Sequence, residues 1–170
     1  ASPLALAIFA TLPTLQTGTP NATDVNVGAN GTRTLAPGTY RDLIVGKKGT
    51  VTFTGGTYTF RNITLSSEAK LFFSAASTIR VQQKISANTL TVIRPGTGAS
   101  ITAAQIVFHV AGINGTSGTL AATPKSVEIG ADSTFTANLL APNGTIWFKD
   151  RALATGAFVR EVVTTGVAGQ

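Results

Sequence analysis

The stretch that decides the fold is residues 43–81, LIVGKKGTVTFTGGTYTFRNITLSSEAKLFFSAASTIRV. It consists of short segments of apolar residues and threonine, and turns rich in glycine, serine and lysine separate them. Each segment has a counterpart 20 or 21 residues later in the chain: Leu43 and Ile63, Val51 and Leu71, Tyr58 and Ile79. A fixed period of this length indicates a repeat architecture.

The C-terminal half of the chain shows the same behaviour. Its counterparts are 18 or 19 residues apart: Val127 and Ile146, Phe135 and Leu153, Leu139 and Phe158. Three segments per period predict an all-β fold, a right-handed parallel β-helix (β-solenoid) with about six coils of about 20 residues and three strands per coil. Glycine-containing turn dipeptides such as Gly55-Gly56 and Asn143-Gly144 agree with this prediction.

A β-sandwich is the alternative, because it too has short strands and frequent turns. The solenoid explains the spacing better, since counterparts return at nearly constant separation. Stacked coils about 4.8 Å apart would align inward residues such as Val51 and Leu71 into apolar columns. We therefore expect one solenoid domain over residues 35–170, preceded by an apolar extension and lead-in over residues 1–34.

The apolar extension lies outside the repeat and has no obvious partner within its own coils. It could cap its own rod or add to a neighbouring subunit as an extra strand. We expect its apolar side chains to mediate assembly: Leu4, Leu6, Ile8, Phe9, Leu12 and Leu15.

The amino-acid composition excludes or disfavours several classes of function for this chain. The chain has 43% hydrophobic and 12% charged residues, and it contains no cysteine, which excludes disulfides and thiolate metal sites. No apolar run is long enough to span a bilayer. The net charge of +6 suggests attraction to polyanions, although charges spread singly are also typical of a solvated surface. We do not expect nucleic acid as a partner.

Few residues suggest catalysis. His109 is the single histidine and lies in an apolar segment, where a structural role is the simpler interpretation. Asp132 and Asp150 are 18 residues apart, so adjacent coils could bring them together as a weak glycosidase signal. Lys149 and Arg151 flank Asp150 and offer local neutralisation instead. We therefore predict a non-enzymatic protein with no catalytic residues, no cofactor and no metal.

Binding would instead use residues that point outward from the strands. Trp147 lies between Ile146 and Phe148, so strand alternation should turn it outward, as a sugar-stacking residue would be. Thr52 and Thr59 are predicted to belong to an outward threonine-rich ligand face.

Several segments resemble bacterial secreted and cell-surface β-solenoid proteins. They are Leu35-Ala-Pro-Gly-Thr-Tyr-Arg-Asp-Leu, Thr54-Gly-Gly-Thr-Tyr-Thr-Phe, Ile106-Val-Phe-His-Val-Ala-Gly and residues 134–159. The resemblance is to the ice-binding-like adhesin fold and to bactofilin-like solenoids that form polymers. It implies a protein that is secreted, extracellular or at the cell surface, with no catalytic residues. Arg80, Gln82 and Lys84 depart from the flat threonine face of a good ice binder.

The leading hypothesis is therefore a structural protein that assembles with copies of itself into a surface fibre or coat. Its physical basis is that a solenoid has two open ends with unpaired backbone groups. The alternative is an ice- or carbohydrate-binding adhesion module, with a cell-surface polysaccharide as partner.

Overall fold

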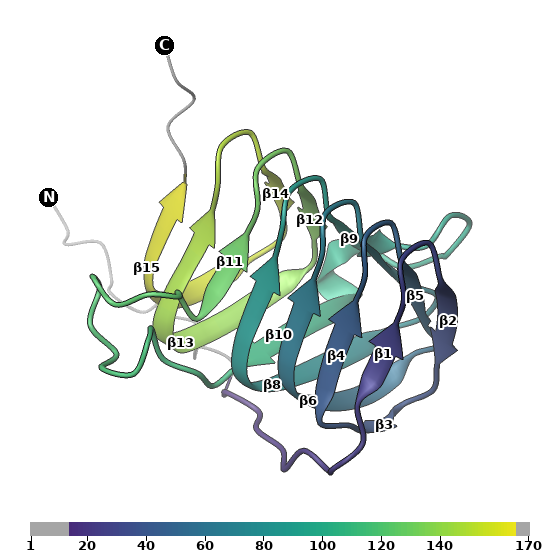
Figure 1. The fold of residues 1–170 in the computed structure, drawn as a ribbon, viewed down its shortest axis with the longest axis horizontal. Helices are drawn as coiled ribbons and strands as arrows, with labels where there is room; N and C mark the ends of the chain where they lie inside the picture. Colours follow the sequence, from purple (N-terminus) through teal and green to yellow (C-terminus); the bar gives the residue numbers. More distant parts are fainter. Residues whose placement is uncertain (1–13, 166–170) are drawn as a thin grey trace, which may run out of the picture.

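A computed structural model describes residues 14–165 of the chain, and side chains are described for residues 14–159. Within this range the chain winds into a parallel β-solenoid with three faces (Figure 1). Each coil crosses the faces in the same order, and successive coils follow one another along the rod. The predicted all-β solenoid, with three strands per coil and about six coils, is confirmed.

Face 1 and face 3 are joined by long strands that cross the corner between them. Face 1 consists of β1 (Val25–Val27), β4 (Asp42–Val45), β11 (Val127–Ile129) and the second halves of β6 (Gly56–Leu65), β8 (Ser77–Ala87), β13 (Asn138–Phe148) and β15 (Phe158–Thr165). Face 3 consists of β3 (Gly38–Thr39), β10 (Ile106–Val110) and the first halves of those four long strands.

Face 2 is a separate sheet whose six strands all run parallel. It consists of β2 (Thr32–Leu35), β5 (Thr50–Phe53), β7 (Lys70–Phe73), β9 (Val92–Pro95), β12 (Thr134–Thr136) and β14 (Leu153–Thr155). The strands β2 to β14 are ordered along this sheet as they are in the sequence, so successive coils stack in chain order.

The strand register confirms five of the six counterpart pairs predicted from the sequence. These pairs face each other directly across neighbouring strands: Leu43 and Ile63, Val51 and Leu71, Tyr58 and Ile79, Val127 and Ile146, Leu139 and Phe158. Repetition of apolar residues is therefore a reliable guide to register in this chain.

The sixth prediction, Phe135 opposite Leu153, is wrong by one residue. Phe135 pairs with Ala154, and Leu153 pairs with Thr134. The Leu153 N–H donates to the Ser133 carbonyl at 2.8 Å, and this hydrogen bond sets the register. A shift of one residue turns a side chain to the opposite face of the sheet. Leu153 consequently points outward and is 70% exposed.

The solenoid begins earlier than the predicted boundary at residue 35. β1 pairs with β4, and β2 pairs with β5, so both strands belong to the first coil. The coil repeat therefore starts at Val25. Residues 14–24 lie before this repeat and run outside the coils.

The buried apolar residues form one continuous cluster between the three faces, and this cluster extends along the described part of the rod. The rings of Phe53 and Phe73 stack with centroids 4.7 Å apart, and both side chains are fully buried. Phe73 also meets Phe108 edge to face at 6.0 Å, and Phe108 meets Phe135 at 5.5 Å. These four aromatic rings form a continuous series of contacts in the core.

The corner between faces 1 and 2 is a tight turn that recurs in every coil. One residue of each turn is not glycine yet has a positive φ, between 56° and 63°: Asn30, Lys48, Glu68, Leu90, Asp132 and Arg151. This conformation is uncommon for such residues. In the first five turns the N–H of that residue donates to a carbonyl of the next turn, for example Leu90 to Ala131 at 2.9 Å. These bonds between coils help to offset the backbone strain.

Two insertions interrupt the repeat without breaking the rod. The first lies between β9 and β10 and contains η1 (Ala103–Gln105), and the second lies between β10 and β11. β8 pairs with both β10 and β11, so the coil closes normally around the insertions. Within residues 14–165, no helix is long and apolar enough to cross a membrane.

Candidate functional site

A strap formed by residues 14–24 crosses the outside of face 3 before the chain enters β1 (Figure 1). The backbone N–H of Gln16 donates to His109 Nδ1 at 3.1 Å, and Arg80 Nη2 donates to Gln16 Oε1 at 2.9 Å. Since His109 and Arg80 lie on β10 and β8, the strap runs along the rod from the middle coils back to the first one.

The strap covers Thr59, which the sequence predicted as part of an exposed ligand face. Thr59 points outward from β6, but it is only 5% exposed. A Cβ atom added at Gly18 of the strap would lie 2.7 Å from Thr59 Oγ1. A side chain at position 18 would therefore force Thr59 or the strap to shift. The prediction for Thr59 is wrong because the chain's own N-terminal segment occupies that face.

Of the predicted assembly residues, only Leu15 can be placed. It lies half-buried at the start of the strap. The others, Leu4, Leu6, Ile8, Phe9 and Leu12, lie outside the described residues, so their role in assembly stays a prediction.

His109 is buried beneath the strap and serves as a hydrogen-bond acceptor. Its Nδ1 accepts the Gln16 N–H, so this nitrogen carries no proton in the folded state. Burial, and to a smaller extent the charge of Arg80, lowers the pKa of His109. Both effects favour the neutral imidazole, which holds the strap against face 3.

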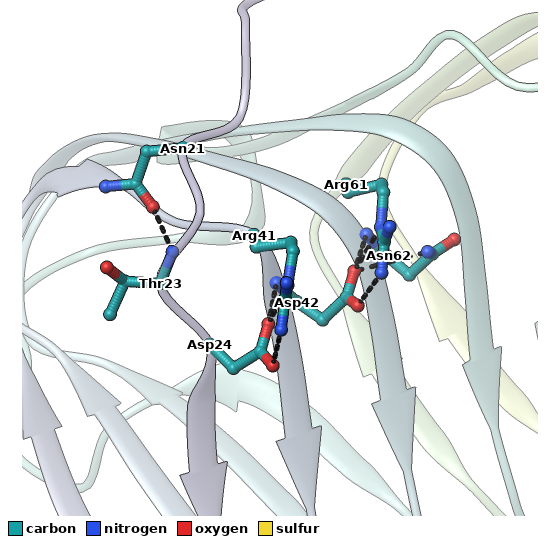
Figure 2. A network of polar contacts seen from close by, with 7 residues as sticks. All are labelled: Asn21, Thr23, Asp24, Arg41, Asp42, Arg61 and Asn62. Atoms are coloured by element: carbon teal, nitrogen blue, oxygen red, sulfur yellow. Dashed lines mark hydrogen bonds and ion pairs between the residues drawn. The ribbon is translucent and has the colours of Figure 1, made fainter.

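Ion pairs between coils follow the corner between faces 3 and 1. Figure 2 shows Arg41 reaching Asp24 and Arg61 reaching Asp42, each through two nitrogens. The Arg41 Nε to Asp24 Oδ1 distance is 2.7 Å. Hydrogen bonds from the two guanidinium groups lower the pKa of both carboxyl groups. These carboxylates are therefore engaged in joining one coil to the next.

Asp132 and Asp150 are brought to adjacent coils, as their spacing predicted. The Asp132 N–H donates to the Asp150 carbonyl at 3.0 Å. The Asp132 carboxylate, however, binds Arg151 through two hydrogen bonds of 2.6 and 2.7 Å, which lower its pKa. This carboxylate has the same kind of arginine partner as those at the other corner.

Face 2 presents two parallel columns of outward side chains. Strand alternation places them opposite the buried column of Val51, Leu71, Ile93 and Phe135. The first column contains Thr32, Thr50, Lys70, Val92, Thr134 and Leu153, and the second contains Thr34, Thr52, Phe72, Arg94, Thr136 and Thr155. None of these positions is a carboxylate. Thr52 is half-exposed here, and its part in a ligand face stays a prediction.

Trp147 lies on face 1 and points outward, as strand alternation predicted. Ile146 and Phe148 are buried in the core, whereas Trp147 points outward and is half-buried. Lys149 Nζ lies 4.8 Å from the centre of the indole ring and 3.1 Å from a carboxylate oxygen of Glu128. Because the ammonium group covers the ring, Trp147 is less open to a sugar than the sequence indicated.

The three residues predicted as a ligand surface therefore lie on three different faces. Trp147 is on face 1, Thr52 on face 2 and Thr59 on face 3 beneath the strap. They cannot contact one ligand together. Of the three faces, face 2 has the most regular array of exposed polar groups. Among residues 14–165, no group of three or more His, Asp or Glu side chains is placed to hold a metal ion.

Comparison with protein-family models, curated proteins and solved structures gives no significant match to this chain.

Proposed function

We propose that this chain is a non-catalytic carbohydrate-binding adhesion module that works outside the cell or at its surface, with face 2 as the ligand surface. The observation that carries the proposal is the outward threonine array, which fills seven of the twelve outward positions on this face. Threonine hydroxyls can donate to and accept from sugar hydroxyls. The extracellular location rests on the resemblance to bacterial surface solenoids.

Carbohydrate fits this face better than ice does. The middle coils replace threonine with Lys70, Phe72 and Arg94, and a lysine ammonium binds water strongly. Charged, strongly hydrated groups interrupt the flat and weakly hydrated surface that ice would need. A polysaccharide tolerates such groups, because its own hydroxyl and charged groups can replace the bound water.

We expect the double variant Thr52→Val and Thr136→Val to bind polysaccharide about 30-fold more weakly than the wild type. Each lost hydrogen bond contributes about 1 kcal/mol, and valine preserves the shape of the strand surface. Binding would be measured by affinity electrophoresis against a panel of soluble polysaccharides, with ice-growth inhibition measured in parallel.

The matched control is Thr64→Val, which removes an exposed hydroxyl from face 1. It should bind like the wild type. Equal binding by wild type and double variant, or no binding to any glycan, would contradict the proposal. Ice-growth inhibition that is lost in the double variant, without glycan binding, would favour the ice-binding alternative.

A second candidate function, self-assembly into a fibre or coat, is favoured by the open edge of the first coil. Among the described strands, β1, β2 and β3 each have a partner on one side only. Thr50 donates to the Gly31 carbonyl and Thr54 to the Leu35 carbonyl, so odd-numbered residues of β2 face β5. The peptide groups of Thr32 and Thr34 consequently face the open edge.

Within the described residues, the apolar core is not exposed at this end of the rod. Val25 and Leu35 of the first coil are at most 3% exposed, and Arg33 occupies the end of the column that continues with Val51. A charged residue at such an inward position is a common protection against edge pairing. Because Arg33 protects this edge, we favour carbohydrate binding over self-assembly as the function.

If assembly uses this edge, Thr34→Pro should abolish polymers seen by electron microscopy while the protein stays folded. Proline removes the N–H that faces the open edge, and proline is tolerated at edge strands. Thr34→Ala keeps this N–H and should assemble normally. Polymers that persist in Thr34→Pro would exclude the edge of β2 as the joint.

A further inference from the structure

The cationic side chains of the described coils differ in their partners. Those at the corners are paired with carboxylates: Arg41 with Asp24, Arg61 with Asp42, Lys47 and Lys48 with Glu68, Lys149 with Glu128, and Arg151 with Asp132. Arg80, Lys84 and Lys125 donate to amide or carbonyl oxygens of the chain itself. On the outward side of face 2, by contrast, Lys70 and Arg94 have no ion-pair partner within the described part of the chain. Among the described residues, face 2 therefore carries positive charge that no carboxylate neutralises.

These two cations lie at the centre of the face. Lys70 is opposite Val92 and Phe72 is opposite Arg94, so Lys70 and Arg94 are diagonal neighbours on β7 and β9. A strand spacing of about 4.8 Å and a rise of about 6.6 Å over two residues place their Cα atoms about 8 Å apart. At this distance the side chains of Lys70 and Arg94 can both reach one anionic group of a ligand, or two consecutive anionic groups.

The Arg94 guanidinium is held in a defined place. Its Cζ lies 5.1 Å from the centre of the Phe72 ring. Stacking on an aromatic ring orients the planar group and lowers the entropy lost when a ligand binds. An arginine fork held in this way suits a carboxylate or sulfate group, which it can bind through two hydrogen bonds.

Threonine hydroxyls flank the two cations on both sides along the rod. Thr50 and Thr52 lie on the neighbouring β5, and Thr134 and Thr136 lie on the neighbouring β12. A chain molecule lying along the rod would therefore meet hydroxyl groups, then two cations, then hydroxyl groups again. This order fits a polymer that carries both hydroxyl and acidic groups.

We infer that face 2 binds an acidic polysaccharide, with Lys70 and Arg94 contacting its carboxylate or sulfate groups and the threonines on β5 and β12 contacting its hydroxyls. The inference rests on the proposed carbohydrate-binding function and specifies its ligand class. Nucleic acid fits less well, since single strands are bound by exposed aromatic platforms. The aromatic side chain of face 2, Phe72, is half-buried and covered by Arg94.

The test compares the double variant Lys70→Gln and Arg94→Gln with the wild type on four probes: polygalacturonate, dextran sulfate, uncharged dextran and single-stranded DNA. We expect the wild type to prefer the acidic probes and the variant to lose at least about tenfold in affinity for them. Raising the salt concentration should weaken wild-type binding to the acidic probes and leave binding to dextran unchanged.

The control variant is Lys47→Gln and Lys48→Gln, which removes the same charge from an exposed corner. It should retain the affinity for acidic probes to within about threefold, because these lysines are already paired with Glu68. Circular dichroism melting curves confirm that both variants are folded.

The outcomes separate the inference from the proposed function. If the Thr52→Val and Thr136→Val variant loses binding, but acidic and neutral probes bind alike and the face 2 charge variant is unaffected, the inference fails and carbohydrate binding stands. If the two charge variants weaken binding equally, or single-stranded DNA binds as tightly as polygalacturonate, binding is non-specific attraction to polyanions and the inference fails. If no polysaccharide binds, both fail.

Discussion

Replacing Phe73 with alanine should lower the free energy of unfolding by about 3–5 kcal/mol. The Phe73 ring is fully buried, stacks on Phe53 at 4.7 Å and meets Phe108 at 6.0 Å. Alanine at this position would leave a cavity in the middle of the aromatic column. Because the coils on either side are held by continuous strand pairing, they cannot close this gap. Urea denaturation followed by circular dichroism measures the loss.

The preceding residue on the same strand provides the control. Phe72 points outward, is half-buried and contacts Arg94 on the surface. Phe72→Ala should therefore cost about 1 kcal/mol or less. Equal losses for the two variants would contradict the assignment of Phe73 to the core and of Phe72 to the surface.

The difference between Phe72 and Phe73 shows what the sequence predicts well. A solenoid core repeats, so each inward residue has a counterpart about one period away, and the two residues bury each other. The pairing of Val51 with Leu71 and of Tyr58 with Ile79 follows directly from this repetition. Where the inward residue is small, the signal weakens. Ala154 was therefore passed over in favour of its more apolar neighbour Leu153.

The sequence contains no comparable signal for the conformation of the corner turns. Their positive-φ residues include Glu68, Leu90 and Arg151, which are not residues that usually mark such a conformation. Hydrogen bonds between successive coils hold this geometry, and side-chain preference does not reveal it. Local sequence therefore could not predict these turns, although the constant distance between counterparts implies that they are alike.

The candidate site was predicted only in part, for two reasons. The sequence indicated which side chains point outward, but the prediction did not assign Thr52, Thr59 and Trp147 to separate faces. The sequence did contain this information, because the three strand segments of each period follow one another in a fixed order and each belongs to a different face. Coverage of Thr59 by the strap could not be predicted, because it depends on Gly18 and Gln16 meeting strands far away in the sequence.

Replacing Asn114 with alanine should lower the free energy of unfolding by about 2–6 kcal/mol. This side chain is 1% exposed at the base of the second insertion. Its Oδ1 accepts the N–H groups of Ser126 and Thr145 at 3.0 and 2.9 Å. Its Nδ2 donates to Thr145 Oγ1 at 2.8 Å. Alanine would leave two buried N–H groups without partners, at about 1–3 kcal/mol each.

Asn143 supplies a matched control, since it begins an identical Asn-Gly-Thr triplet. It is exposed and makes one hydrogen bond, from Nδ2 to the Ala111 carbonyl at 3.0 Å. Asn143→Ala should therefore cost less than about 1 kcal/mol. Hydrogen exchange adds a local measurement: the amides of Ser126 and Thr145 should lose protection in Asn114→Ala and keep it in Asn143→Ala. Unchanged protection of both amides in Asn114→Ala would mean that strand pairing alone closes the coil around the insertion.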